Sequence, residues 1–74
     1  MKNLKDEFTD GTQPRKEGLF LVCVSGNGED YNFLCRAVWR MKTRDRDHFR
    51  FQREAGECRV EPERVEYILR VNGQ

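Results

Sequence analysis

The chain has 74 residues, of which 36% are hydrophobic and 36% are charged, and its formal net charge is +1. This length allows one domain with a thin core and leaves little structure for a deep pocket that excludes water. No apolar run approaches the about 18 residues of a membrane span, and no signal-peptide hydrophobic region follows Met1. We therefore expect one small domain with no membrane partner.

The first segment, residues 1–17, is rich in charged residues, with Leu4 and Phe8 as its only large hydrophobic side chains. This composition predicts a flexible N-terminal tail. Two alternatives remain open for it. Residues 2–8 could form a single amphipathic turn if Leu4 and Phe8 dock on the domain, or the segment could be an arm that becomes ordered on a partner.

The domain is predicted to span residues 18–74 and to begin with a strand. Residues 19–24 are apolar on both faces, which is typical of a central strand or of one whose second face is covered. Asn27-Gly28 is the strongest short-range hairpin signal. We therefore expect a reverse strand that begins near Tyr31.

Residues 31–42 fit two patterns, and we favour a strand because the hairpin turn needs a partner strand. As a strand, the inward side chains are Phe33, Cys35, Ala37, Trp39 and Met41, and the outward ones are Asn32, Leu34, Arg36, Val38, Arg40 and Lys42. As a helix, the apolar stripe is Phe33, Leu34, Ala37, Val38 and Met41, with Asp30 as N-cap.

The next strand is predicted at residues 48–53, after a polar turn at 43–47. Strict alternation places Phe49 and Phe51 inward. If Met41 lies opposite Phe49, Trp39 lies opposite Phe51, which would make a well-packed aromatic pair.

Two short segments complete the predicted sheet. A strand at residues 57–61 follows the turn at 55–56, and a 3₁₀ turn at 62–64 precedes a last strand at 65–71. A terminal helix that begins at Pro62 is the alternative for this last segment.

The segment Gly56-Glu-Cys-Arg-Val-Glu-Pro-Glu-Arg-Val-Glu-Tyr-Ile68 resembles the closing part of Sm-like and SH3-like barrels. In those folds a strand, one 3₁₀ turn and a last strand close the sheet. The run from Leu19 also resembles the strand order of Sm-like regulators, including small proteins that bind the transcription termination factor Rho. The resemblance covers roughly residues 18–71 and implies a mainly β fold, a small five-stranded SH3-like or Sm-like barrel. The peptide-groove signature of SH3 domains and the RNA-binding signature of Sm proteins are missing, so it implies architecture and not function.

The three cysteines, Cys23, Cys35 and Cys58, are odd in number and lack the C-x-x-C spacing of zinc and redox sites. Each lies among apolar neighbours in an alternating run, which predicts reduced core residues. We therefore expect a cytoplasmic protein without a metal or a cofactor.

Positive charge is concentrated in the middle of the chain. Residues 34–53 hold seven basic and two acidic residues, a net charge of +5, whereas each flanking segment sums to −2. Like charges on neighbouring strands repel one another, so this concentration points to an anionic partner. The predicted binding residues are Arg36, Arg40, Lys42, Arg44, Arg46, His48 and Arg50.

No catalytic group is predicted, so we do not expect an enzyme. The only histidine, His48, takes a solvated position on an exposed strand, and Ser25 lies in a turn without G-x-S-x-G context.

Two binding functions remain, beside the simpler interpretation that the arginines form a solvated face. The first is a regulatory module that binds single-stranded nucleic acid, because arginine engages phosphates and stacks on bases. The second is a protein-binding module or inhibitor, of the phage or mobile-element type, that binds an acidic protein surface. The outward Leu34 and Val38 among arginines favour the second function. An open sheet edge could also pair with a second copy of the chain.

Overall fold

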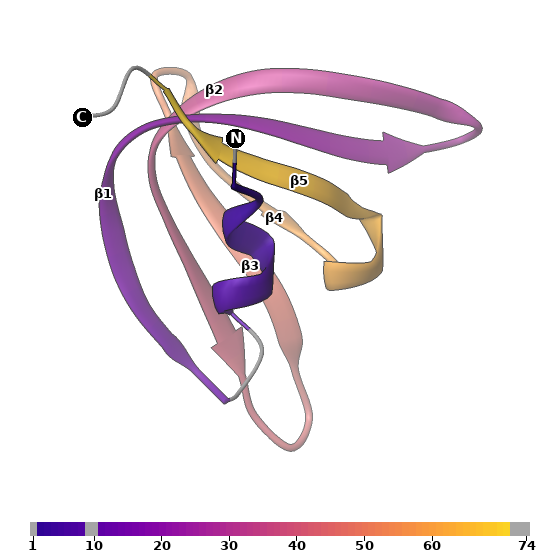
Figure 1. The fold of residues 1–74 in the computed structure, drawn as a ribbon. Coiled ribbons are helices and arrows are strands. Elements are labelled where there is room, and N and C mark those ends of the chain that lie inside the picture. Colours follow the sequence, from indigo (N-terminus) through magenta and orange to yellow (C-terminus); the bar gives the residue numbers. More distant parts are fainter. Residues whose placement is uncertain (1, 9–10, 72–74) are drawn as a thin grey trace.

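The protein is a single antiparallel β-sheet with two short 3₁₀ turns (Figure 1), seen in a computed structural model that describes residues 2–8 and 11–71. The elements in chain order are η1 (Leu4–Glu7), β1 (Gln13–Gly26), β2 (Glu29–Lys42), β3 (Asp47–Arg53), β4 (Gly56–Val60), η2 (Pro62–Arg64) and β5 (Val65–Arg70). The strand order is β4-β3-β2-β1-β5. The predicted mainly β fold is therefore confirmed. No helix of the described residues combines the length and the apolar character needed to cross a bilayer.

β1 and β2 form a long hairpin that extends beyond the rest of the sheet (Figure 1). Its turn has φ angles of 52° at Asn27 and 79° at Gly28. Two consecutive positive φ angles are typical of a type I′ turn, whose twist matches that of the flanking strands. The predicted hairpin is confirmed, and β2 is a strand and not a helix. Because β1 lies between β2 and β5, residues 19–24 have sheet neighbours on both sides.

The core is formed by large side chains that converge from all five strands and from the N-terminal segment. The buried members of this cluster are Phe8, Phe20, Val22, Val24, Cys35, Val38, Phe49, Phe51, Val60, Val65 and Ile68. Phe33, Leu4 and Cys58 pack against them while remaining partly exposed. The core therefore consists of one face of the sheet together with a side chain, Phe8, that precedes the sheet in sequence.

The side of β2 that faces the core changes along its length. Cys35 and Val38 both belong to the core, although strict alternation would place residues three apart on opposite faces. The pairing of β1 with β2 is irregular at the same place, between Glu17 and Phe20, where two residues of β1 lie opposite one residue of β2. Such a bulge increases the local twist and bends the strand.

This change of side makes the predicted register wrong by one residue. Phe49 lies opposite Arg40 and not opposite Met41, and Phe51 lies opposite Val38 and not opposite Trp39. A slip of one residue moves every side chain of a strand to the other face. Val38, predicted to face outward, is fully buried, whereas Trp39 and Met41 are only partly buried.

The N-terminal segment is docked on the sheet, which corresponds to the amphipathic-turn alternative for residues 2–8. Phe8 is completely buried, and its ring meets that of Phe49 edge-on, with 5.6 Å between the centroids. Residues 13–17, which the sequence placed in the tail, belong to β1. A buried phenylalanine contributes about 1.5–3 kcal/mol, which offsets part of the entropy lost when the segment is ordered.

The same segment covers the outer edge of β5. The side-chain amide of Asn3 donates from Nδ2 to the carbonyl of Glu66 (3.3 Å) and accepts at Oδ1 from the backbone N–H of Ile68 (3.0 Å). Lys5 Nζ donates to the carbonyl of Val65 (2.5 Å). These bonds satisfy backbone groups that an edge strand would otherwise expose.

β4 and β5 end the strand order on opposite sides, and no ladder joins them within the described residues. The sheet is therefore open, and the predicted closed barrel is not confirmed.

We expect the Phe8→Ala substitution to lower the free energy of unfolding by about 3–5 kcal/mol, because it leaves a cavity in the core. Urea denaturation followed by tryptophan fluorescence measures this change, and Phe8→Leu provides a milder variant if the alanine variant does not fold. The exposed Leu34→Ala should change stability by less than about 0.5 kcal/mol. Equal stabilities for Phe8→Ala and Leu34→Ala would contradict the docked position of Phe8.

Candidate functional site

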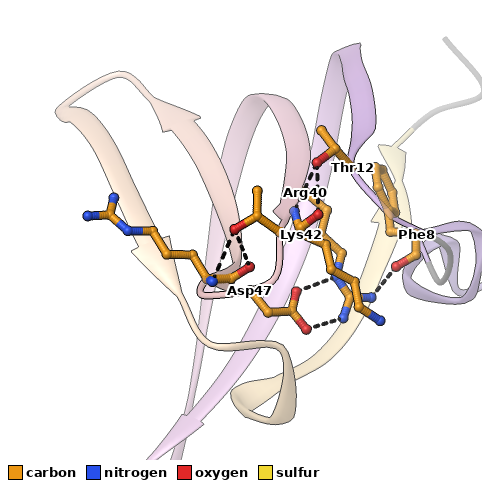
Figure 2. A network of polar contacts seen from close by, with 7 residues as sticks. Phe8, Thr12, Arg40, Lys42 and Asp47 are labelled. Carbon is orange, nitrogen blue, oxygen red and sulfur yellow. Dashed lines mark hydrogen bonds and ion pairs between the residues drawn. The ribbon is translucent and has the colours of Figure 1, made fainter.

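Arg40 is an internal structural residue of the network in Figure 2. Only 9% of it is exposed. Its Nε and Nη2 donate to the two carboxylate oxygens of Asp47, each at 2.8 Å, and its Nη1 donates to the carbonyl of Phe8. The guanidinium also lies 5.2 Å from the centroid of the Phe49 ring. Its hydrogen bond lowers the pKa of the Asp47 carboxyl. Arg40 is one of the predicted binding residues, but its guanidinium is already bonded to partners within the protein.

The turn between β2 and β3 presents three exposed cations, Lys42, Arg44 and Arg46, which we call the basic turn. Its backbone is held at both ends. Thr43 N donates to the carbonyl of Arg46 (2.7 Å), and Arg46 N donates to Thr43 Oγ1 (3.1 Å). The hydroxyl of Thr12 donates to the carbonyl of Lys42 and accepts from its N–H, both at 3.1 Å (Figure 2). The three cations therefore project from a fixed backbone, and none of them has an ion pair with another described residue.

A row of three arginines and one tryptophan crosses four strands on the outer face of the sheet. Trp39 lies opposite Arg50, and Arg50 lies opposite Arg59. Arg15 contacts the same ring from β1, where the pairing with β2 is also irregular between Gln13 and Lys16. Its guanidinium carbon is 4.8 Å from the Trp39 centroid, and that of Arg50 is 5.5 Å away. Arg15, Trp39, Arg50 and Arg59 are called the arginine row below.

Two glutamates neutralise part of the arginine row. Glu57 Oε2 accepts from Arg50 Nε at 2.8 Å and lies 2.6 Å from its Nη2, and it is 3.9 Å from Arg59 Nε. Glu17 Oε2 is paired with Arg15 Nε at 2.8 Å. Arg50 is thus held firmly, whereas Arg59 keeps 59% of its side chain exposed. The less restrained cations of this region are Arg59 and the basic turn.

His48 lies on β3 between the basic turn and the arginine row, opposite Met41. Burial is the main cause that lowers the pKa of its imidazole, and the neighbouring positive charges of Arg59, Arg50 and Arg46 lower it further. A histidine with such a pKa is neutral at pH 7.

The structure separates the predicted binding residues. Arg40 and Lys42 alternate with Trp39 and Met41, which lie opposite Arg50 and His48. His48 and Arg50 therefore lie on the other face of the sheet from Arg40 and Lys42, although the predicted alternation of the two strands turned all four side chains outward. Arg36 is exposed at the point where β2 changes sides.

Three residues of this region were missed by the sequence analysis: Arg15, Trp39 and Arg59. Arg15 and Arg59 lie outside residues 34–53, and Trp39 was assigned to the core. The correct register would have found two of them, because Arg50 lies opposite both Trp39 and Arg59. The register was missed because the bulge in β1 changes which side of β2 faces the core, and the buried arginine at position 40 gives no apolar signal of this change.

The cysteines lie in or against the core, as predicted. Cys23 and Cys35 are buried, Cys58 is partly buried, and all three are free thiols. Burial raises the pKa of the Cys35 thiol to about 12, so the thiol stays protonated. Within residues 2–8 and 11–71, no three His, Cys, Asp or Glu side chains come together as metal ligands could.

An open hollow of about 470 Å³ lies beside the β1–β2 turn and is lined by Ser25, Gly26, Asn27, Gly28 and Arg64. Arg64 Nε donates to the carbonyl of Ser25 at 2.7 Å, and the Ser25 hydroxyl donates to the carbonyl of Arg64 at 3.3 Å. A Cβ at Gly26 would come within 2.8 Å of Arg64 Nη2. Arg64 therefore holds the hairpin against η2.

Arg40 and Arg36 are adjacent cations of β2 with different surroundings, so they make a matched pair of variants. We expect Arg40→Ala to lower the free energy of unfolding by about 2–3 kcal/mol, since it leaves the Asp47 carboxylate and the Phe8 carbonyl without their donor. Arg36→Ala should change it by less than about 0.5 kcal/mol. Urea denaturation of both variants tests the assignment, and a stable Arg40→Ala variant would refute it.

No protein family, curated protein or solved structure compared with this chain matches it.

Proposed function

We propose that this protein is a non-enzymatic regulatory module that binds single-stranded nucleic acid. The proposed surface consists of Arg44 and Arg46 of the basic turn, the arginine row and His48; Lys42, the third cation of the basic turn, lies on the other face of the sheet. The observation that carries the proposal is that the exposed cations Arg46 and Arg59 lie near His48, on the face of the sheet where Arg50 lies opposite Trp39.

The chemistry of this surface supports a nucleic-acid partner. Guanidinium groups bind phosphate oxygens with two parallel hydrogen bonds, and their planes stack on bases. Single-stranded nucleic acid offers both groups at short, regular intervals. The held backbone of the basic turn reduces the entropy lost on binding, because its cations do not depend on a mobile loop.

The finer architecture is part of the same proposal. We infer a small Sm-like barrel that is left open between β4 and β5. The strand order β4-β3-β2-β1-β5 and the 3₁₀ turn at Pro62–Arg64 support this inference. The cytoplasmic location and the pairing of a sheet edge with a second copy stay predictions.

The first test compares two variants from which equal charge has been removed. We expect Arg46→Ala/Arg59→Ala to bind a short single-stranded RNA or DNA more weakly than the unmodified protein. The slope of log affinity against log salt concentration should decrease by about 0.7 for each lost phosphate contact, or about 1.4 in total. Fluorescence anisotropy of a labelled strand at several salt concentrations measures both quantities.

The matched control is Lys2→Ala/Arg36→Ala, which removes two exposed cations outside the proposed surface. Its salt slope should stay close to that of the unmodified protein. If both double variants lose affinity equally, the interaction is with net charge and the proposed surface is wrong. If the unmodified protein binds neither RNA nor DNA at low salt, the proposed function is wrong.

A second candidate function is the binding of an acidic protein, and one observation favours it. Leu34 is 54% exposed and lies in a cross-strand row with Leu21 and Leu69 on β1 and β5. Arg36 follows two positions along the same strand. Apolar side chains next to an arginine are typical of the centre of protein interfaces, where lysine and acidic residues are depleted. Val38, which the sequence analysis counted with this patch, is buried and takes no part in it.

This candidate predicts a complex that depends on Leu34. A pull-down from nuclease-treated cell lysate should recover one acidic protein with the unmodified chain, and Leu34→Asp should lose it, because the substitution places a carboxylate in the contact. Arg46→Ala/Arg59→Ala should retain the complex. A complex that is lost on nuclease treatment would support the nucleic-acid function instead.

A further inference from the structure

His48 has an environment that neither a solvated surface histidine nor a core residue explains. Its Nε2 atom is buried and has no hydrogen-bond partner among the described residues. Buried polar atoms in folded proteins are almost always paired, because an unpaired one loses its hydration without compensation. An unpaired imidazole nitrogen beside exposed arginines therefore points to a ligand.

The charged groups around His48 come from three elements and are mostly positive. Arg46 belongs to the basic turn, Asp47 and Arg50 belong to β3, and Arg59 belongs to β4, while β2 presents the uncharged Met41. Asp47 is engaged by Arg40, and Arg50 is engaged by Glu57. Arg46 and Arg59 remain as the two guanidinium groups with the most freedom to approach an anion beside the imidazole.

We propose that Arg46, His48 and Arg59 form a subsite for one phosphate group of the bound strand, and that His48 takes up a proton when the phosphate binds. This inference rests on the proposed nucleic-acid function and adds a defined contact to it. The two arginines donate to phosphate oxygens from their planar forks, and the imidazolium donates from Nε2 once a rotation of the His48 side chain has brought this buried atom to the surface. The proton comes from the solvent, the phosphodiester keeps its single negative charge, and no covalent bond is made or broken.

Electrostatics gives the reason for the proton uptake. In the free protein the pKa of His48 is lowered by burial and by the three arginines. A phosphate placed among these groups contributes a negative charge next to the imidazole and cancels part of their repulsion, so the pKa rises in the complex. Binding and protonation are then linked, and each one favours the other.

The direction of the pH dependence follows from these two pKa values. At a pH above the pKa of the complex, His48 is neutral in both states and contributes nothing to the pH dependence. As the pH falls between the pKa of the complex and that of the free protein, affinity rises by up to about tenfold per pH unit. Below the pKa of the free protein the affinity becomes constant. Because the pKa of His48 in the free protein is lowered from its ordinary value of 6.5, the lower end of this range lies below that pH.

The experiment titrates the protein with a short oligouridylate that has no terminal phosphate, between about pH 8 and about pH 5.5 at constant low ionic strength. Its phosphodiesters and bases do not titrate in this range, and neither do the arginines. Trp39 is the only tryptophan and belongs to the arginine row, so its fluorescence reports binding without a label. We expect affinity to rise at least fivefold as the pH falls (a fraction of the about tenfold per unit that one proton allows).

The decisive variant is His48→Gln, which keeps a polar side chain that cannot titrate. It should bind the oligouridylate with an affinity that does not change with pH. Arg36→Ala provides the control, because it should weaken binding only slightly and retain the full pH dependence. Folding of each variant is checked by its urea denaturation curve.

A second measurement follows the histidine itself. His48 is the only histidine of the chain, so its imidazole ring signals in an NMR spectrum need no assignment. We expect the pKa obtained from these signals to rise when the oligouridylate is added, and to rise in the same direction with inorganic phosphate.

The outcomes separate the subsite from the proposed function. If the oligouridylate binds with an affinity that depends on salt but not on pH, or if His48→Gln keeps the pH dependence, the subsite is wrong and the nucleic-acid function stands. If the oligouridylate does not bind but inorganic phosphate raises the pKa of His48, the subsite stands as a phosphate site for another ligand and the nucleic-acid function falls. If the oligouridylate does not bind and inorganic phosphate leaves the pKa of His48 unchanged, both are wrong.

Discussion

The guanidinium of Arg40 joins three parts of the chain, and most of the structure depends on it. It lies on β2, is paired with a carboxylate of β3, and donates to the backbone of the N-terminal segment. A buried arginine has five N–H donors to satisfy, and each partner that it finds fixes another piece of structure. The bond to the Phe8 carbonyl keeps the Phe8 ring against the core. The ion pair between Arg40 and Asp47 holds the first residue of β3 against β2, directly after the basic turn.

The burial of Arg40 also decides which cations remain at the surface. In sequence, residues 36–50 contain arginines that look alike. In space, Arg40 is enclosed, Arg50 is held between Glu57 and the Trp39 ring, and Arg44 and Arg46 are exposed. Net charge counted along a segment therefore overstates the number of groups that a partner can reach. The exposed cations are fewer than the count suggests.

Local signals were enough to predict most of the fold. Asn27-Gly28 predicted the hairpin, the proline at position 62 predicted the 3₁₀ turn, and the alternation around Phe49 and Phe51 predicted β3. These features depend on neighbours in sequence, and the structure retains each of them. The docking of Phe8 was only one of three alternatives, because its partner, Phe49, is far away in the chain.

The candidate site was predicted less well, and the reason is the bulge in β1. The bulge in β1 changes which side chains of β2 face the core. The alternating sequence of β2 does not reveal this change. The assignment of Trp39 and Arg40 to the wrong faces follows from this single long-range feature. The region is basic, as predicted, but it also includes Arg15 of β1 and Arg59 of β4.

The bonds between Asn3 and β5 have a consequence for the order in which the protein folds during its synthesis. Asn3 is hydrogen-bonded to the backbone of residues 66 and 68, so the N-terminal segment can dock only on the last strand, β5. On the ribosome, residues 2–8 emerge before β5 and have no edge to bind until β5 has been made. During that interval Phe8 and Leu4 lack the part of the core that β5 contributes, Val65 and Ile68. Closure of the core is therefore a late event that waits for most of the chain.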